Sequence, residues 1–284
     1  MHQLKNKVTQ LAPRTMMTQA PRKFFSSPVA SGPGYGTMAL IGMGTGGLAY
    51  LSYRAHQMRT ERLLNSNTPQ MHLFNPVVQD RIRKTLMYFG GGLALTGGLV
   101  GAFRNSLFAL NHPWMLLFGS LGCMIGTFMT DYDRQFALKT LFWGGFMAAT
   151  GLGMVPLIRM AGMPIVYDAM FATGATVGGL SMVAYNAPSE QFLMWGGALG
   201  MGCAGMLGIG LASMFWPSPA LYNMWLYGGL VLFSAFVLYD TQKIIHNAKT
   251  KNRYDPISES IHIYLDTIIL FERFMIIFMN NKKK

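Results

Sequence analysis

The chain has 284 residues, of which 51% are apolar and only 12% are charged, about half of the roughly 25% that is usual for a soluble domain. A soluble enzyme is therefore not expected, and the net charge of +12 does not indicate a nucleic-acid partner, because the basic residues lie in the terminal segments and loops. Between them lie apolar blocks of roughly 17 to 25 residues, long enough to cross a hydrocarbon core, so we predict a polytopic protein of the lipid bilayer.

The N-terminal segment, residues 1–34, has the composition of a mitochondrial transit peptide. It is rich in Ser, Thr and Gln, contains no acidic residue and lacks the continuous apolar core of a secretory signal. The stretch from Arg22 to Ser27 resembles the pattern at which matrix peptidases cut, so we expect cleavage near residues 24–31. The alternative is a disordered basic tail on the cytosolic side of some other membrane.

Eight apolar segments follow the leader, and each is expected to cross the bilayer as a helix. Strands are excluded because the segments are long and continuously apolar, and unpaired backbone groups are costly in lipid. The predicted fold class is therefore an all-α polytopic membrane protein. We expect one N-terminal span at 35–53, a hydrophilic basic loop at 54–84, a seven-helix core at 85–279 and a basic tail at 280–284. The core spans are expected at 85–103, 113–130, 136–158, 164–185, 191–215, 223–246 and 261–279.

The orientation of these spans is left open by two conflicting arguments. The segments 54–84, 131–139 and 243–260 share one side and carry twelve Lys and Arg residues, against five on the other side after the first span. The positive-inside rule then places these segments in the matrix. A cleaved presequence favours the opposite orientation, because it tends to leave the new N-terminus in the matrix.

Cysteine and histidine patterns do not indicate a metal site or a reaction. Cys123 and Cys203 both lie inside apolar spans, and no pair of histidines has the spacing of transition-metal ligands. No nucleophile, base and orienting group occur at a recognisable spacing. We therefore expect neither enzymatic activity nor a cofactor.

Acidic residues inside the spans are the functional candidates, since a charge at the centre of a membrane helix costs about 2.5 to 3.5 kcal/mol on insertion scales. Asp168 lies only about one turn into its span and can reach the interface. Glu272 is followed by Arg273, and local pairing could neutralise it, so we keep it only as a possible accessory residue.

Asp240 and Asp266 form the strongest candidate site. Each lies 13 residues from residue 253, the centre of a polar turn between two spans. Antiparallel helices therefore place the two carboxyl groups at one depth, where they are expected to titrate as a unit and to bind protons in competition with a transient Ca²⁺ ion. The structural alternative is a proton-sharing pair that only holds two helices together.

These two residues belong to motifs that resemble a known family. The segment from Tyr239 to Ile245 and the segment from Ile263 to Phe271 are similar to the last two core helices of the transmembrane Bax inhibitor motif family. The leader and the additional first span resemble its mitochondrial branch. The resemblance implies a multi-pass protein of the mitochondrial inner membrane with a pH-sensitive Ca²⁺ pathway, possible calcium/proton exchange, and involvement in cristae organisation and cytochrome c retention.

One feature of the family pattern is missing. Bacterial relatives have an arginine near the end of the second core helix that latches the acids, whereas this chain has Asp131 and Asp133 there. These residues could form a cation entrance or an ordinary solvated turn. The alternative function belongs to another class: a non-transporting scaffold that regulates apoptosis through inner-membrane or cristae proteins, with purely structural aspartates.

Overall fold

The computed structural model describes residues 75–105, 108–187 and 190–282. The predicted leader, the span at 35–53 and most of the basic loop fall outside these ranges. All regular structure in the described ranges is helical, as predicted. The seven long helices correspond one to one with the seven predicted core spans: α2 (Pro76–Phe103), α4 (Pro113–Met129), α5 (Phe136–Ala161), α6 (Met163–Asn186), α7 (Gly196–Phe215), α9 (Gly229–Thr250) and α10 (Pro256–Lys282).

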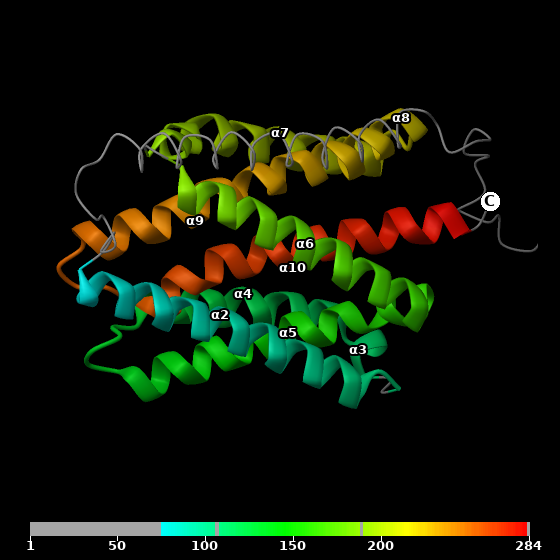
Figure 1. Cartoon of the computed structure of the whole chain (residues 1–284). Helices are drawn as coiled ribbons and strands as arrows, with labels where there is room; N and C mark the ends of the chain where they lie inside the picture. Colours follow the sequence, from blue (N-terminus) through cyan, green and yellow to red (C-terminus); the bar gives the residue numbers. More distant parts are fainter. Residues whose placement is uncertain (1–74, 106–107, 188–189, 283–284) are drawn as a thin grey trace, which may run out of the picture. The chain divides into compact units, whose positions relative to one another are not determined.

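Four short helical segments connect the long helices in the described ranges: α3 (Phe108–Asn111), η1 (Gln191–Trp195), α8 (Pro219–Asn223) and η2 (Met224–Gly228). Segment η2 has π-helical hydrogen bonding and leads directly into α9. Figure 1 shows the long helices gathered in a bundle, with the α9–α10 connection and the α4–α5 connection at the same end.

The start of α2 corrects the predicted boundary of the basic loop. Residues 76–84 are helical, although their charges led us to expect a loop up to residue 84. Asn75 caps the helix, because its side-chain oxygen accepts a hydrogen bond from the backbone N–H of Val77 at 3.1 Å. Pro76 follows at the first helical position, where its missing N–H costs nothing. The charged turns are therefore a helical extension of the span.

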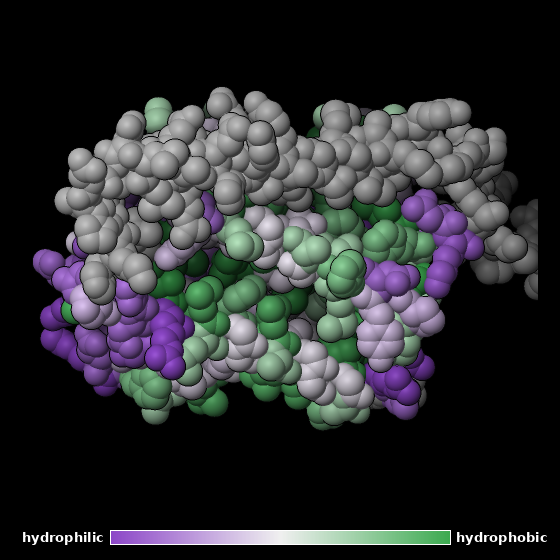
Figure 2. All heavy atoms as spheres, in the orientation of Figure 1, coloured by the Kyte–Doolittle hydropathy of each residue, from purple (hydrophilic) through white to green (hydrophobic). Residues whose placement is uncertain are grey.

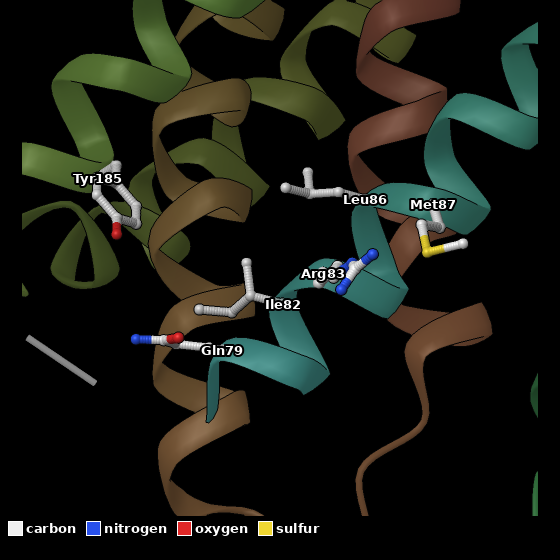
Figure 3. Close-up of a pocket in the computed structure, with 6 residues that line it drawn as sticks. All are labelled: Gln79, Ile82, Arg83, Leu86, Met87 and Tyr185. Atoms are coloured by element: carbon white, nitrogen blue, oxygen red, sulfur yellow. The ribbon is translucent and has the colours of Figure 1, made fainter. Parts of the chain in front are cut away.

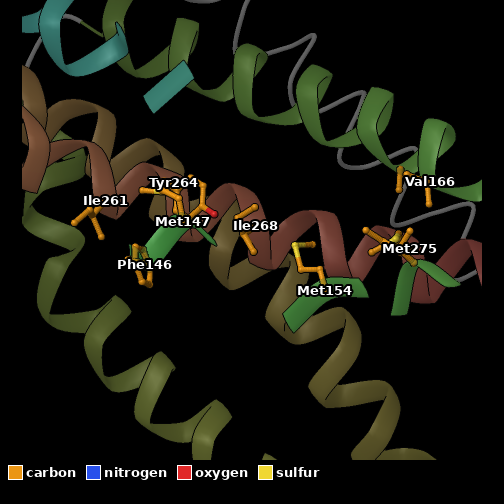
Figure 4. Close-up of a cluster of buried hydrophobic side chains, with 10 residues drawn as sticks. Phe146, Met147, Met154, Val166, Ile261, Tyr264, Ile268 and Met275 are labelled. Carbon is orange, nitrogen blue, oxygen red and sulfur yellow. The ribbon is translucent and has the colours of Figure 1, made fainter. Parts of the chain in front are cut away.

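Helix α10 is the centre of the bundle. It packs against α2, α5, α6 and α9, and Figure 1 shows it running between them. Its apolar side chains join one core cluster with residues of α5 and α6. Figure 4 shows this cluster, with labels on Phe146, Met147, Met154, Val166, Ile261, Tyr264, Ile268 and Met275. Tyr264 is completely buried, and its hydroxyl group lies 2.7 Å from the Thr96 hydroxyl of α2.

Four helical segments are long and apolar enough to cross a membrane: Pro76–Phe103, Phe136–Ala161, Gln191–Phe215 and Pro219–Thr250. Helix α4 is also apolar but has only 17 residues. The polar residues of α10 are directed mainly into the protein, so this helix does not need the uniform apolarity of a lipid-facing span. Figure 2 shows hydrophobic side chains over the middle of the bundle and hydrophilic ones at both ends.

Candidate functional site

The structure brings Asp240 of α9 and Asp266 of α10 together. The two helices form an antiparallel hairpin whose loop, residues 251–255, surrounds the turn centre expected at residue 253. Both side chains are buried, with exposed fractions of 6% for Asp240 and 4% for Asp266. Their carboxyl groups lie close enough to act electrostatically on each other. Two ionised carboxylates in such a buried position repel each other, and a shared proton relieves that repulsion.

One oxygen of the pair has no hydrogen-bond partner. Within the described ranges, Oδ2 of Asp266 is buried and unpaired. Buried polar atoms in proteins are nearly always hydrogen-bonded, and an exception requires an explanation such as an ion, a water molecule or a chemical role. The pair is therefore a site that a proton, a water molecule or a cation can complete.

Asp255 fixes the start of α10. Its Oδ1 accepts hydrogen bonds from the backbone N–H groups of Ile257 at 3.1 Å and Ser258 at 3.2 Å. Its Oδ2 accepts a hydrogen bond from the Ser258 hydroxyl at 2.7 Å. Pro256 is the first helical residue. The N-cap thus determines where α10 begins, and therefore how far along the hairpin Asp266 lies.

A buried lysine holds this cap against the α4–α5 hairpin. The side chain of Lys139 is only 1% exposed, and its Nζ lies 2.6 Å from Oδ2 of Asp255. The same ammonium group donates hydrogen bonds to the backbone carbonyls of Thr127 at 2.6 Å and Thr130 at 2.7 Å. All three of its donors are therefore used, which offsets the cost of burying a charge. Lys139 was not predicted to have this role.

Arg81 of α2 holds the other half of the loop. Its guanidinium group donates hydrogen bonds to the carbonyls of Ala248 at 2.9 Å, Lys251 at 2.7 Å and Asn252 at 3.2 Å. These are carbonyls at the C-terminal end of α9, where a cation also complements the helix dipole. Arg81 and Lys139 contact the hairpin loop and neither Asp240 nor Asp266, so these basic residues do not provide the arginine latch of the family pattern.

A second polar layer lies between the aspartate pair and the loop. Glu259 is 5% exposed, and its carboxylate accepts hydrogen bonds from Nδ2 of Asn247 at 2.9 and 3.0 Å and from Lys251 at 2.7 Å. Asn247 is seven residues, or two helical turns, nearer to the loop than Asp240, and Glu259 is seven residues nearer to it than Asp266. The same symmetry about residue 253 that located the first pair could have located this one.

Two basic side chains lie between these layers. Lys243 is close enough to act electrostatically on both aspartates, and His262 acts on Asp240. The ring of His262 also packs against Phe128, with 5.7 Å between ring centroids. Lys243 was not predicted as part of the site, although it stands three residues after Asp240 on the same helix. The loop-facing side of the pair therefore contains both positive and negative groups.

The remaining predicted candidates lie away from the pair. Asp131 and Asp133 are exposed in the α4–α5 connection. Asp133 lines a cavity of about 270 Å³ that also contains Asp80, Lys84 and Arg253. This is a mixed-charge surface at the loop end, and no contact joins it to the pair within the described ranges. Asp168 is exposed on α6.

The local ion pair expected for Glu272 is absent from the described part of the chain. Arg273 instead donates a hydrogen bond to the backbone carbonyl of Trp225 at 2.5 Å and lies over the Trp225 ring at 4.2 Å from its centroid. Adjacent residues on a helix point in different directions, so Glu272 and Arg273 do not face each other. Arg273 therefore stabilises the π-helical segment η2, and Glu272 is not brought to the aspartate pair.

A further cavity between α2 and α6 has no acidic residue in its lining. A cavity of about 460 Å³ lies between the first turns of α2 and Tyr185 of α6. Figure 3 shows its lining residues: Gln79, Ile82, Arg83, Leu86, Met87 and Tyr185. None of them is acidic. Across the described ranges, no three His, Cys, Asp or Glu side chains gather as a metal cluster, so any cation at the pair would have only two side-chain carboxylates.

Comparison with known proteins assigns residues 78–283 to one protein family. A family model described as inhibitor of apoptosis-promoting Bax1 matches residues 78–283. The growth hormone-inducible transmembrane protein of Rattus norvegicus is 37% identical over 227 residues, which cover 73% of this chain and 65% of the rat protein. The chain thus spans just under two thirds of that relative's length.

Two further relatives are more distant. Bax inhibitor 1 of Bos taurus is 29% identical over 213 residues, covering 73% of this chain and 89% of the bovine protein. A probable Bax inhibitor 1 of Paralichthys olivaceus is 27% identical over 223 residues, covering 77% of this chain and 89% of the fish protein. The matched region includes both helices that supply the aspartate pair.

Proposed function

This chain belongs to the Bax inhibitor family of polytopic membrane proteins, and from that premise we propose that it exchanges Ca²⁺ for protons across a membrane. The observation that carries the proposal is the buried, neighbouring pair of Asp240 and Asp266, which leaves one carboxyl oxygen unpaired within the described ranges. The proposed membrane is the mitochondrial inner membrane, because residues 1–34 have the composition of a transit peptide and a relative is the rat growth hormone-inducible protein.

The proposed chemistry follows from the charge of the pair. With one shared proton, the pair carries a single negative charge and holds α9 and α10 together. Loss of that proton leaves two carboxylates whose repulsion is strong in a low-dielectric site, and either a proton or a cation relieves it. Ca²⁺ prefers six to eight oxygen ligands. Two carboxylates would therefore need backbone carbonyls and water, and such a site binds weakly enough to release its ion.

The second polar layer supports access from the loop end. Glu259 and Asn247 lie two turns from the aspartates, and Lys251 neutralises Glu259. In this proposal a cation approaching from the loop passes the Glu259 carboxylate before it reaches Asp240 and Asp266. Lys243 and His262 lie along the same route, so protonation of His262 opposes cation entry in acid.

Purified full-length protein in liposomes tests the proposal. We expect Ca²⁺ uptake accompanied by stoichiometric proton movement, measured with two luminal dyes. Asp266→Asn and Asp240→Asn should each reduce flux to near background and change its pH dependence, and the double variant should be little worse than either, since residues that act as a unit are not additive. Asp168→Asn is the matched control, because it removes an exposed acid from another span.

Two other results would redirect the interpretation. Flux without proton movement would replace exchange by a pH-gated channel. Absence of flux from a correctly folded wild-type protein would overturn transport and leave the scaffold function, which the family description links to inhibition of apoptosis-promoting Bax1. The location is tested separately: deletion of residues 1–31 should abolish mitochondrial import, and unchanged inner-membrane targeting would overturn the transit-peptide prediction.

A further inference from the structure

A third cavity lies on the opposite half of the bundle from the hairpin loop. Its volume is about 420 Å³, and residues of α2, α5, α6 and α10 line it. The inner wall consists of buried residues such as Met154 of α5 and Ile268 of α10. The outer rim is exposed and includes Gly97 of α2 and Tyr167 of α6. The cavity is therefore a groove that opens sideways between two membrane helices.

The groove offers an apolar surface with its polar groups already satisfied. Three threonines line it, and each hydroxyl is engaged within the protein. Thr96 hydrogen-bonds with Tyr264 at 2.7 Å, Thr173 donates to the carbonyl of Ala169 at 2.7 Å, and Thr267 donates to the carbonyl of Ile263 at 2.7 Å. A ligand that lies along the groove needs no hydrogen-bonding groups, so its buried part should be a hydrocarbon chain.

Glycines keep the groove open. A Cβ atom built on Gly97, Gly101 or Gly174 would meet nothing within 4 Å, and all three line the cavity. They differ from Gly92, where a Cβ would touch the Met147 sulfur at 3.1 Å. Gly97 and Gly101 therefore do not serve close packing between helices. Their missing side chains leave space that faces the lipid.

One end of the groove carries a positive charge. Arg104 lines the cavity at the C-terminal end of α2, is exposed, and has no acidic partner within the described ranges. The lining of α2 extends from Leu93 to Arg104, a rise of about 16 Å at 1.5 Å per residue. This matches one leaflet, half of a hydrocarbon core about 30 Å thick. Tyr167, 62% exposed, lies at the rim with its amphipathic ring.

We propose that this groove binds an anionic phospholipid, with one acyl chain between α2 and α6 and its phosphate group at Arg104. The groove is as long as one leaflet is deep, its walls are apolar, and its interfacial end carries one cation. These three features fit a lipid of the surrounding bilayer. The site is separate from the aspartate pair and does not depend on calcium transport.

Photolabelling of the full-length protein in phosphatidylcholine liposomes tests this site. The probe is phosphatidylglycerol with a diazirine in one acyl chain, and the comparison probe is phosphatidylcholine with the same chain. Mass spectrometry should find adducts concentrated on peptides that contain Met154, Met170 and Phe271. The anionic probe should label them about fivefold more, the factor for about 1 kcal/mol from one basic residue near anionic lipid.

Variants separate the acyl and headgroup contacts. The double variant Gly97→Leu with Gly174→Leu fills the groove and should remove the labelling by both probes. Gly98→Leu is the matched control, because Gly98 is an exposed neighbour on α2 that also has open space but does not line the cavity. Arg104→Gln should keep the labelling and abolish the preference for phosphatidylglycerol. Circular dichroism and thermal unfolding check that each variant folds.

Four outcomes would overturn the proposal. Labelling of the groove no stronger than labelling of exposed α7 would show ordinary lipid contact. Unchanged labelling after the groove is filled would place the lipid elsewhere. Labelling by a diazirine fatty acid but by neither phospholipid would assign the groove to a free fatty acid. Absence of labelling by all three probes would leave a segment of the chain itself as the occupant.

Discussion

Helices α10 and α7 are both long helices of the bundle, yet they have opposite surroundings. Fourteen residues of α10 are buried, among them Asp266 and Arg273, whereas Leu199 is the one buried residue of α7. Helix α7 contains no charged residue and presents large side chains such as Met201 and Leu207 outward. A span in contact with lipid needs to be apolar throughout, and a span enclosed by other helices does not.

The comparison shows that hydropathy detects contact with lipid more directly than it detects the core. The segment with α7 is among the four that are apolar enough to cross a membrane by composition, and α10 is not. The helix that carries half of the proposed site is thus the less typical span. Substitutions in the α9–α10 hairpin should therefore lower the free energy of unfolding more than equivalent substitutions at exposed positions. Four experiments test this contrast.

The largest effect is expected at the hairpin loop. Asp255→Ala removes both the N-cap of α10 and the acidic partner of buried Lys139. Removing one partner of a buried ion pair leaves an uncompensated charge, and we expect about 3 kcal/mol less free energy of unfolding. Denaturant unfolding in detergent measures it. Asp80→Ala is the control, because its pair with Lys84 is more than half exposed on both sides and should contribute less than about 0.5 kcal/mol.

Two glycine-to-alanine substitutions, one in the α9–α10 hairpin and one in α7, compare the two regions directly. A Cβ at Gly229 of α9 would collide with the guanidinium group of Arg273, which the Trp225 carbonyl and ring hold in place. Gly229→Ala should therefore destabilise the protein by about 1 to 3 kcal/mol, as overpacking does. Gly205→Ala in α7 enters open space and should stabilise by about 0.5 to 1 kcal/mol. Equal shifts of the unfolding midpoint in both variants would contradict the contrast.

A hydroxyl deletion gives a smaller effect. Tyr264→Phe removes the hydrogen bond to Thr96 in the core and should cost about 1 kcal/mol. Combined with Thr96→Val, the loss should be less than additive, because one interaction is deleted twice. Ser213→Ala in α7 removes only a local bond to the carbonyl of Gly210 and should be nearly neutral. Additive losses for Tyr264 and Thr96 would show that their contact contributes nothing.

The smallest effect is expected at Tyr254, and it concerns the alkaline pH dependence of stability. Burial raises the pKa of Tyr254 from 10.0 to about 12, and its hydroxyl lies 2.6 Å from that of Thr85. The folded state therefore holds the phenol proton more tightly than the unfolded state. This contribution is present below pH 10 and is lost as pH rises to about 12. Tyr254→Phe should make the alkaline loss of stability shallower than in the wild type; an unchanged slope would contradict the assignment.

The sequence predicted the helices better than their polar contacts. Each predicted core span overlaps one of the long helices, and the proximity of Asp240 and Asp266 agrees with their equal distance to residue 253. Asn75 and Pro76 also form a sequence pattern that is typical of a helix start. The charged residues that follow them nevertheless led to the prediction of a loop up to residue 84. The layer of Glu259 obeyed the same symmetry and was overlooked because a glutamate near a turn usually faces water.

Other contacts had no local signal. The role of Lys139 depends on carbonyls at the end of α4 and on a carboxylate far along the chain, so no spacing rule identifies it. Arg273 was expected to pair with its neighbour in the sequence. Its actual partner is a carbonyl of the π-helical segment, whose irregular hydrogen bonding the apolar run from Met224 does not indicate.

The burial of Lys139 has a consequence for biogenesis. The ribosome makes the α4–α5 hairpin long before Asp255 exists, so the lysine must enter the nascent membrane domain without its ion-pair partner. The carbonyls of Thr127 and Thr130 come from the preceding helix and are already available to the ammonium group. In the early hairpin these two carbonyls can therefore satisfy two of the three ammonium donors of Lys139. When α10 is inserted, Asp255 supplies the negative charge that completes the ion pair.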